Sequence, residues 1–204
     1  VVNLFKVIQQ EPAALAEKIF LTPYSRKIYD KAWEIRPENE IDKALNFVIR
    51  SVMSHGFRNI EKSGWKMDEN GRERAYAVKH WNDLPELIQE MTLRLRQVQI
   101  ESRPAIELID KYNREGVCMY IDPPYVLSTR TRKQYTVEME DREHEELLEI
   151  LNHSKAKIIL SGYDSDLYNK RLSNWGRAEF AATAEKGLPR IEILWMNFQP
   201  KQQL

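Results

Sequence analysis

The sequence predicts an α/β domain with a largely parallel sheet. In the second half of the chain, short apolar runs alternate with segments of helical periodicity. Residues 117–121 are apolar without interruption, which is typical of a parallel strand covered on both faces, and residues 156–160 (AKIIL) are expected to form another buried strand. Pro104 and Gly116 mark the expected start and end of a helix that precedes the first of them.

The first half of the chain is predicted to be mainly helical. Residues 3–20 have helical periodicity, and Pro12 begins the second of two helices there. The segment 22–81 differs in character and carries Asn70-Gly71, the preferred pair of a tight type I′ hairpin turn. We therefore expect helices that flank a β-hairpin in this segment.

The remaining elements follow from periodicity and from helix-start and helix-stop residues. In chain order, we expect a helix over 81–95 entered through Asp83 and Pro85, a strand over 96–101, a helix from Pro104 to Gly116, a strand over 117–121, a helix capped by Asp141, a strand over 156–160, a short helix over 166–172, and a closing antiparallel pair from RAEFAA and RIEILWMN. Trp195 and Phe180 are expected in the core, and His144 on a solvated helix face.

Composition excludes some classes of protein. The 31 basic and 31 acidic side chains cancel, so no global field favours a nucleic-acid partner, although local patches remain open. The single cysteine, Cys118, excludes an internal disulfide, and its apolar surroundings predict a buried, inert thiol. No apolar run is long enough to span a bilayer and no signal-peptide pattern is present, so we expect a soluble cytoplasmic protein.

The tetrapeptide Asp122-Pro123-Pro124-Tyr125 follows directly on an apolar strand. Ligands of open α/β sheets bind beyond the carboxyl ends of the strands, where Asp122 is expected. The two prolines fix two φ angles and hold Asp122 extended. The Asp122 carboxylate and the Pro123 carbonyl then suit the two hydrogens of an amino group on a flat ring, while Tyr125 stacks on that ring.

A simpler interpretation is a proline turn in which Asp122 accepts local amides. An isolated Asp-Pro pair favours that interpretation, because such pairs are common turn signals. The full tetrapeptide is different, since its chance occurrence in a chain of this length is on the order of one in a thousand. The motif therefore favours a binding or catalytic site.

DPPY after an apolar strand resembles the catalytic signature of the DNA adenine-6-amino methyltransferases. The surroundings resemble the Dam-type, D12 class, many of whose members are phage enzymes. The resemblance is specific from Trp81 onward and weaker over residues 22–80, where this family has a variable target-recognition insertion. It rests on these segments: WNDLP, RLRQVQIESRPAIELIDKY, MYIDPPYV, MEDREHEELLEIL, IILSGYDSDLY and RIEILWMN.

The resemblance implies a Rossmann-like sheet that uses S-adenosylmethionine, with a catalytic domain over 1–21 and 82–204. It also implies a mainly helical target-recognition insertion over 22–81 that contains the hairpin. The methyl group would go to the 6-amino group of an adenine flipped out of duplex DNA. No metal is needed for this chemistry, and the four histidines show no ligand spacing.

The resemblance also assigns site residues. Asp122 and the carbonyl of Pro123 would accept hydrogen bonds from the amine, Pro124 belongs to the same rigid turn, and Tyr125 would stack on the base. Asp122 would also lie close to the cofactor, with Glu101 and Ser102 as further cofactor-adjacent residues.

Two groups of cations are candidates for contacts to double-stranded DNA, and the alternative for each is an ordinary solvated surface. They are Arg130, Arg132 and Lys133 after the motif, and Lys66, Arg72 and Arg74 around the predicted hairpin. We expect a monomer or weak dimer that binds duplex DNA.

The chain departs from the pattern of this family at the cofactor loop. The sequence has seven glycines and no G-x-G, so neither an F-x-G-G-G type loop nor the strand with the ribose-binding acid is found. The two strands that carry them normally lie between RQVQIE and VCMYID, which predicts an incomplete sheet without its first two central strands.

Three explanations of the missing cofactor loop stay open: upstream residues outside this sequence, a second polypeptide, or a remnant that does not bind cofactor. The start without methionine, already in helical periodicity, favours the first. A non-catalytic DNA-binding remnant and an RNA amine methyltransferase are the alternative functions.

Overall fold

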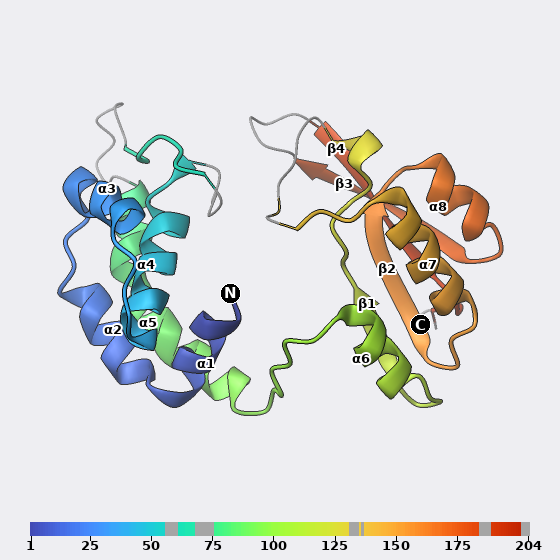
Figure 1. Ribbon diagram of the computed structural model, residues 1–204, viewed down its shortest axis with the longest axis horizontal. Coiled ribbons are helices and arrows are strands. Elements are labelled where there is room, and N and C mark those ends of the chain that lie inside the picture. Colours follow the sequence, from blue (N-terminus) through green and yellow to red (C-terminus); the bar gives the residue numbers. More distant parts are fainter. Residues whose placement is uncertain (56–60, 68–75, 131–134, 136, 184–188, 201–204) are drawn as a thin grey trace. The chain divides into compact units, whose positions relative to one another are not determined.

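The computed structural model describes residues 1–55, 61–67, 76–130, 135, 137–183 and 189–200 (Figure 1). The chain divides into two compact units, Val1–Ser102 and Arg103–Leu204. This division differs from the one expected between catalytic and target-recognition segments, because residues before and after position 22 share one hydrophobic core. The division by function stays a prediction.

The first unit is helical. Its elements are α1 (Val2–Gln10), α2 (Pro12–Phe20), α3 (Arg26–Glu34), α4 (Glu40–Val52) and α5 (Tyr76–Leu95). The two helices predicted within residues 3–20 are confirmed, with Pro12 at the first turn of α2, where its missing N–H costs nothing. None of the described helices is long and apolar enough to cross a membrane.

The predicted entry to α5 through Asp83 and Pro85 is wrong. The helix begins at Tyr76, and Pro85 lies inside it. A proline within a helix costs about 3 kcal/mol because it removes a backbone hydrogen bond. Trp81 and Ile88, on either side of Pro85, are buried in the core of the unit, and their burial offsets that cost.

The core of the first unit also holds the segment between α4 and α5. Tyr24 and Tyr29 donate their hydroxyl protons to the carbonyls of Lys66 and Ser63, at 2.6 and 2.7 Å. Burial raises the pKa of Tyr24 to about 12, so its hydroxyl remains a donor. The predicted hairpin turn at Asn70-Gly71 lies outside the described residues.

The strand predicted over residues 96–101 is wrong, because this segment is irregular after α5 ends. A strand needs a neighbour for its backbone donors and acceptors. Here the Gln9 side chain of α1 donates to the carbonyls of Leu95 and Val98, at 2.7 and 2.9 Å. The amide of Val98 donates back to the Leu95 carbonyl at 3.0 Å, which closes a turn instead of a ladder.

The second unit is an α/β layer. Its described elements are α6 (Ala105–Tyr112), β1 (Cys118–Ile121), the 3₁₀ turn η2 (Leu127–Thr129), α7 (Asp141–Asn152), β2 (Lys157–Tyr163), α8 (Asp166–Arg171), β3 (Gly176–Thr183) and β4 (Pro189–Met196). The strand order is β1-β2-β4-β3. β1 and β2 are parallel, whereas β2–β4 and β4–β3 are antiparallel. The closing antiparallel pair is confirmed, but the described sheet is not largely parallel.

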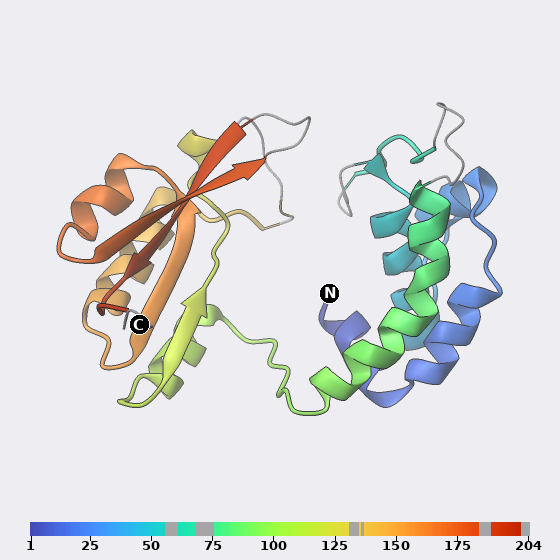
Figure 2. The ribbon, with the colours of Figure 1, turned by 180° about the vertical axis from the view of Figure 1, so that it is seen from behind.

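Helices cover one face of this sheet. α6 and α7 lie in front of the strands in Figure 1 and behind them in Figure 2. On the covered face, Ile158, Leu160, Ile193 and Trp195 are at most 1% exposed, which confirms that Trp195 belongs to the core.

The opposite face of the sheet corrects three expectations. Tyr120 and Phe180 are 61% and 52% exposed, and Cys118 is an exposed free thiol. β1 is therefore not covered on both faces, Phe180 does not belong to the core, and Cys118 is not buried. Alternation explains all three, because every second side chain of a strand points away from the helices.

The start of α7 also differs from expectation. Glu140, not Asp141, is the N-cap, because its side chain and that of Glu143 form a reciprocal capping box. His144 is fully buried, so the predicted solvated position is wrong, and its Nδ1 lies 2.9 Å from the Tyr168 hydroxyl. Burial lowers the pKa of His144, which favours the neutral ring.

α6 ends at Tyr112, earlier than the predicted end at Gly116. Gly116 instead has a φ of +83° in the turn that leads into β1. This left-handed conformation is open to glycine and strained for other residues. Gly116 therefore turns the chain into the sheet and does not close the helix.

Replacement of Gly162 tests the packing behind the sheet. A Cβ at Gly162 would lie 3.2 Å from Trp195 Cζ3 and 3.6 Å from Tyr168 Cε2. Both rings are buried and packed edge-to-face at 5.1 Å, so neither can move away freely. We expect Gly162→Ala to lower the free energy of unfolding by about 1–3 kcal/mol, measured by urea denaturation.

Gly176→Ala is the matched control. Its added Cβ would meet backbone oxygens at 3.6 and 3.7 Å, which is ordinary contact. We expect this variant to unfold at the wild-type urea concentration or above it. Equal losses in the two variants would contradict the packing explanation.

Candidate functional site

The site begins where β1 ends. Asp122 follows Ile121 directly, and the parallel pairing of β1 with β2 brings Ser161 beside it. Ser161 Oγ lies 2.9 Å from Asp122 Oδ1 and 3.2 Å from the carbonyl oxygen of Ile121. Ser161 is 2% exposed, whereas Asp122 is exposed. A buried hydroxyl therefore holds a carboxylate that remains open to solvent.

The two prolines and Tyr125 complete the turn. Pro123 is buried, while Pro124 and Tyr125 are half-buried. The Tyr125 ring meets the Tyr163 ring edge-on, with centroids 4.5 Å apart and planes at 72°. Burial raises the pKa of Tyr125, and the nearby Asp122 carboxylate adds to that effect. Tyr125 therefore offers a neutral ring of fixed orientation.

A second set of contacts ties this turn to β4. The Arg190 guanidinium lies 5.2 Å from the centroid of the Tyr163 ring, a cation–π contact. Arg190 Nη1 also donates to the Thr129 carbonyl at 3.3 Å. Thr129 Oγ1 donates to the Val126 carbonyl at 2.7 Å, which closes η2 onto the residue after Tyr125. β2, β4 and the turn after the motif are thus connected through side chains.

A groove of about 890 Å³ lies beside these residues, beyond the carboxyl end of β2. Tyr163 and Arg190 line it, and Arg190 is the sole lysine or arginine among its described lining residues. Asp164 also lines it, but Asn169 and Arg177 donate to its Oδ1 at 2.8 and 3.1 Å and hold its pKa below the usual range. The groove therefore combines an aromatic wall and one cation with three aspartates, because Asp141 and Asp166 line it as well.

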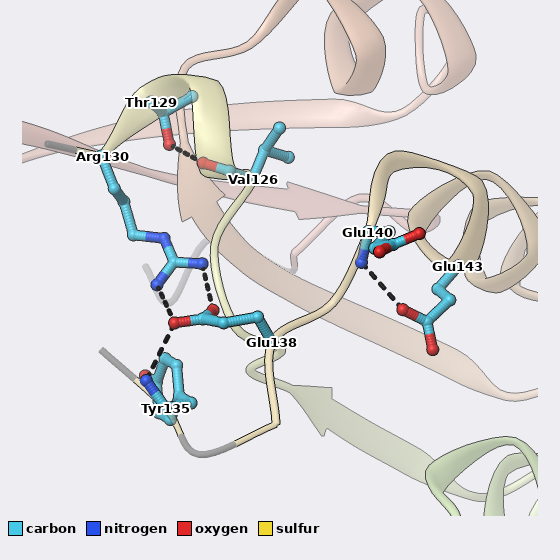
Figure 3. A network of polar contacts seen from close by, with 7 residues as sticks. All are labelled: Val126, Thr129, Arg130, Tyr135, Glu138, Glu140 and Glu143. Carbon is cyan, nitrogen blue, oxygen red and sulfur yellow. Dashed lines mark hydrogen bonds and ion pairs between the residues drawn. The ribbon is translucent and has the colours of Figure 1, made fainter. Parts of the chain in front are cut away.

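Arg130 lies at the end of η2 and is not solvated. Its Nη2 lies 2.6 Å from Glu138 Oε2, and the two side chains are 3% and 8% exposed (Figure 3). The phosphate contact expected of Arg130 would require the guanidinium to leave Glu138. Arg132 and Lys133, the other two cations of that prediction, lie outside the described residues.

The remaining predicted residues belong to the first unit. Lys66 is half-buried, with its Nζ 5.0 Å from the ring centroid of Tyr76. Arg72 and Arg74 lie outside the described residues. Glu101 and Ser102 are exposed residues of the irregular segment after α5, so their cofactor contact stays a prediction. Among the described residues, no three metal-ligating side chains cluster.

Three residues of the site were missed from the sequence: Ser161, Tyr163 and Arg190. Ser161 and Tyr163 follow the apolar run 156–160, and parallel pairing with the strand before Asp122 would have placed them at the same sheet edge. No comparable signal marks Arg190, because it arrives from an antiparallel strand late in the chain.

Fold and site together define an α/β protein with an acidic, proline-rigid turn at the end of a strand and a tyrosine packed against a second tyrosine beside it. The sequence model of the D12 class N6 adenine-specific DNA methyltransferases matches residues 1–185, and the chain belongs to this family. Enzymes of the family methylate adenine in DNA, and methyltransferases of this kind normally use S-adenosylmethionine. No curated protein matches the sequence.

Ser161→Ala tests the support of Asp122. Loss of a hydrogen bond to a charged group is expected to lower kcat/KM for adenine methylation about tenfold, because the carboxylate gains alternative rotamers. The full-length protein, S-adenosylmethionine and duplex DNA are the components of the assay.

Ser154→Ala removes a comparable hydroxyl, which donates to Asn113 Oδ1 at 2.9 Å, and serves as the control. We expect it to lose stability but keep kcat/KM. Full activity of Ser161→Ala would show that the hydroxyl does not position Asp122.

Proposed function

We propose that this protein transfers a methyl group from S-adenosylmethionine to the 6-amino group of an adenine flipped out of duplex DNA. One observation carries the proposal: Asp122 is held by the buried Ser161 through one oxygen and remains exposed beyond the end of β1. In the described part of the chain, no hydrogen bond engages its second oxygen. The membership of the chain in the D12 family supports the same chemistry.

The carboxylate and the adjoining backbone suit a weakly nucleophilic amine. The lone pair of the adenine 6-amino nitrogen is delocalised into the ring. Asp122 and the Pro123 carbonyl would accept its two hydrogens and direct the lone pair out of the ring plane. Fixed acceptors also stabilise the positive charge that develops on nitrogen, and they do so without reorganisation.

The base would stack on Tyr125, whose ring is oriented by its T-shaped contact with Tyr163. Stacking of a base on an aromatic side chain contributes about 1–3 kcal/mol, which offsets part of the cost of leaving the duplex. The half-buried environment keeps the Tyr125 hydroxyl neutral, so the ring adds no charge to the pocket.

S-adenosylmethionine would supply the methyl group. Among the described residues, Asp122 fits a place beside it, because an exposed carboxylate at the strand end is compatible with a cationic donor. Glu101 and Ser102 are proposed as further contacts on the strength of the sequence resemblance.

The groove beside Tyr163 would hold the backbone of the flipped nucleotide. Arg190 keeps further N–H donors beyond the one bonded to Thr129, since a guanidinium has five. A phosphate in the groove would contact the Arg190 guanidinium, which the Tyr163 ring already orients. Arg132, Lys133, Lys66, Arg72 and Arg74 are proposed to contact the duplex elsewhere. We expect a cytoplasmic enzyme that acts as a monomer or weak dimer.

Asp122→Asn tests the catalytic assignment with little change in shape. Loss of the charge weakens the acceptor for the amine, so we expect methylation by the full-length protein to fall about 10²–10³-fold. The measurement is transfer of label from S-adenosylmethionine to adenine in duplex DNA under single-turnover conditions.

Wild-type activity in Asp122→Asn, or no transfer by the wild type, would overturn the proposal. Two further measurements test the alternative functions. Calorimetry that finds DNA binding without cofactor binding would favour a non-catalytic DNA-binding protein. Preference for structured RNA over duplex DNA in competition would favour an RNA amine methyltransferase.

Arg190→Gln tests the phosphate contact. We expect the slope of log Kobs against log salt concentration to become less steep by about 0.9, the contribution of one phosphate on B-DNA. Arg171→Gln removes the same charge outside the groove, at an arginine paired with Glu145, and should leave the slope unchanged. Equal slopes for wild type and Arg190→Gln would exclude a phosphate contact.

A further inference from the structure

We propose that Arg130 and Glu138 form a buried clasp that positions the turn after the DPPY motif. On this proposal Arg130 is a positioning residue for methylation and makes no contact with DNA phosphates. The effect on rate rests on the proposed function. The clasp itself rests on geometry alone.

The clasp consists of one arginine held by one carboxylate (Figure 3). Arg130 Nη2 and Nη1 lie 2.6 and 3.4 Å from the two oxygens of Glu138. The amide of Tyr135 donates to Glu138 Oε1 at 2.9 Å, and the guanidinium lies 5.7 Å from the ring centroid of Tyr135. The same carboxylate thus holds a side chain and a backbone amide.

Burial makes the two partners depend on each other. The side chains of Arg130 and Glu138 are 3% and 8% exposed, so water compensates little of either charge. Arg130 Nε is buried without a hydrogen-bond partner among the described residues. Glu138 is therefore the principal compensation for this guanidinium among the described residues, and removal of Glu138 leaves the buried charge of Arg130 without it.

The clasp joins two elements of the site. Arg130 is the C-cap of η2, whose Thr129 carbonyl accepts from Arg190. Glu138 stands two residues before Glu140, the N-cap of α7. Val126, between Tyr125 and η2, is 5% exposed and packs in the core with α7. The clasp therefore fixes η2 against the start of α7, and η2 is covalently continuous with Tyr125.

A clasp and a phosphate contact predict different results for the same substitution. A phosphate contact contributes to DNA affinity and to its salt dependence, whatever the partner residue. A clasp contributes to the rate of the chemical step through the geometry of Tyr125. The rate that is lost when Arg130 is replaced then depends on whether Glu138 is present. The salt slope and the coupling between Arg130 and Glu138 therefore separate the two roles.

The test uses Arg130→Gln, Glu138→Gln and the double variant in the full-length protein. We expect each single variant to lower the single-turnover rate about 10- to 100-fold. The double variant should lose less than the product of the two single effects, because it leaves no lone buried charge. The salt slope of DNA binding should stay that of the wild type in all three.

Arg142→Gln and Arg130→Lys complete the set. Arg142 is an exposed arginine of α7, and we expect its replacement to leave both rate and slope unchanged. Arg130→Lys keeps the charge and should recover part of the rate lost in Arg130→Gln. A salt slope reduced by about 0.9 in Arg130→Gln, with the rate unchanged, would overturn the clasp in favour of a phosphate contact.

Thermal unfolding of the same variants provides a readout that does not need catalysis. We expect the losses in the free energy of unfolding to be coupled between Arg130 and Glu138, even if the wild type proves inactive on adenine. Additive losses would overturn the clasp. If Arg130→Gln does not fold, the rate and the free energy of unfolding are compared with the wild type in Arg130→Lys and Glu138→Gln instead. Wild-type values of both quantities in these two variants would overturn the proposal.

Discussion

Four residue pairs hold β1 beside β2 in parallel register, from Cys118 opposite Lys157 to Ile121 opposite Leu160, and the site depends on this ladder. Because the strands run in the same direction, both end at one edge of the sheet. The residues that follow the last pair, Asp122 and Ser161, therefore lie side by side and are joined by a hydrogen bond. A shift by one residue would turn Ser161 to the other face and leave the carboxylate without its donor.

The rest of the site is built outward from that edge by side chains with two contacts each. Tyr163 makes a T-shaped ring contact with Tyr125 and lies under the Arg190 guanidinium. Arg190 in turn reaches the Thr129 carbonyl. Each member restricts the next, so the orientation of Tyr125 is determined by contacts that come from three different segments.

The covered face of the sheet supports this arrangement from behind. Gly162 leaves the space in which Trp195 and Tyr168 pack, and the Tyr168 hydroxyl meets the buried ring of His144. α7 carries His144 directly after Glu143 of its capping box, so contacts connect the helix start, the aromatic packing and the end of β2. Val126, directly after the motif, packs in the same core.

The sequence by itself determined the elements whose causes are local. Helical periodicity identified α1 and α2, short apolar runs identified β1 and β2, and two prolines marked the turn that holds Asp122. Tertiary structure decided which segments come into contact. It places Pro85 inside a helix and His144 in the core, pairs Arg130 with Glu138, and joins Ser161 to Asp122 by a hydrogen bond across 39 residues of chain. Dihedral preferences act between neighbours in the sequence, whereas burial and pairing depend on segments that only the folded chain brings together.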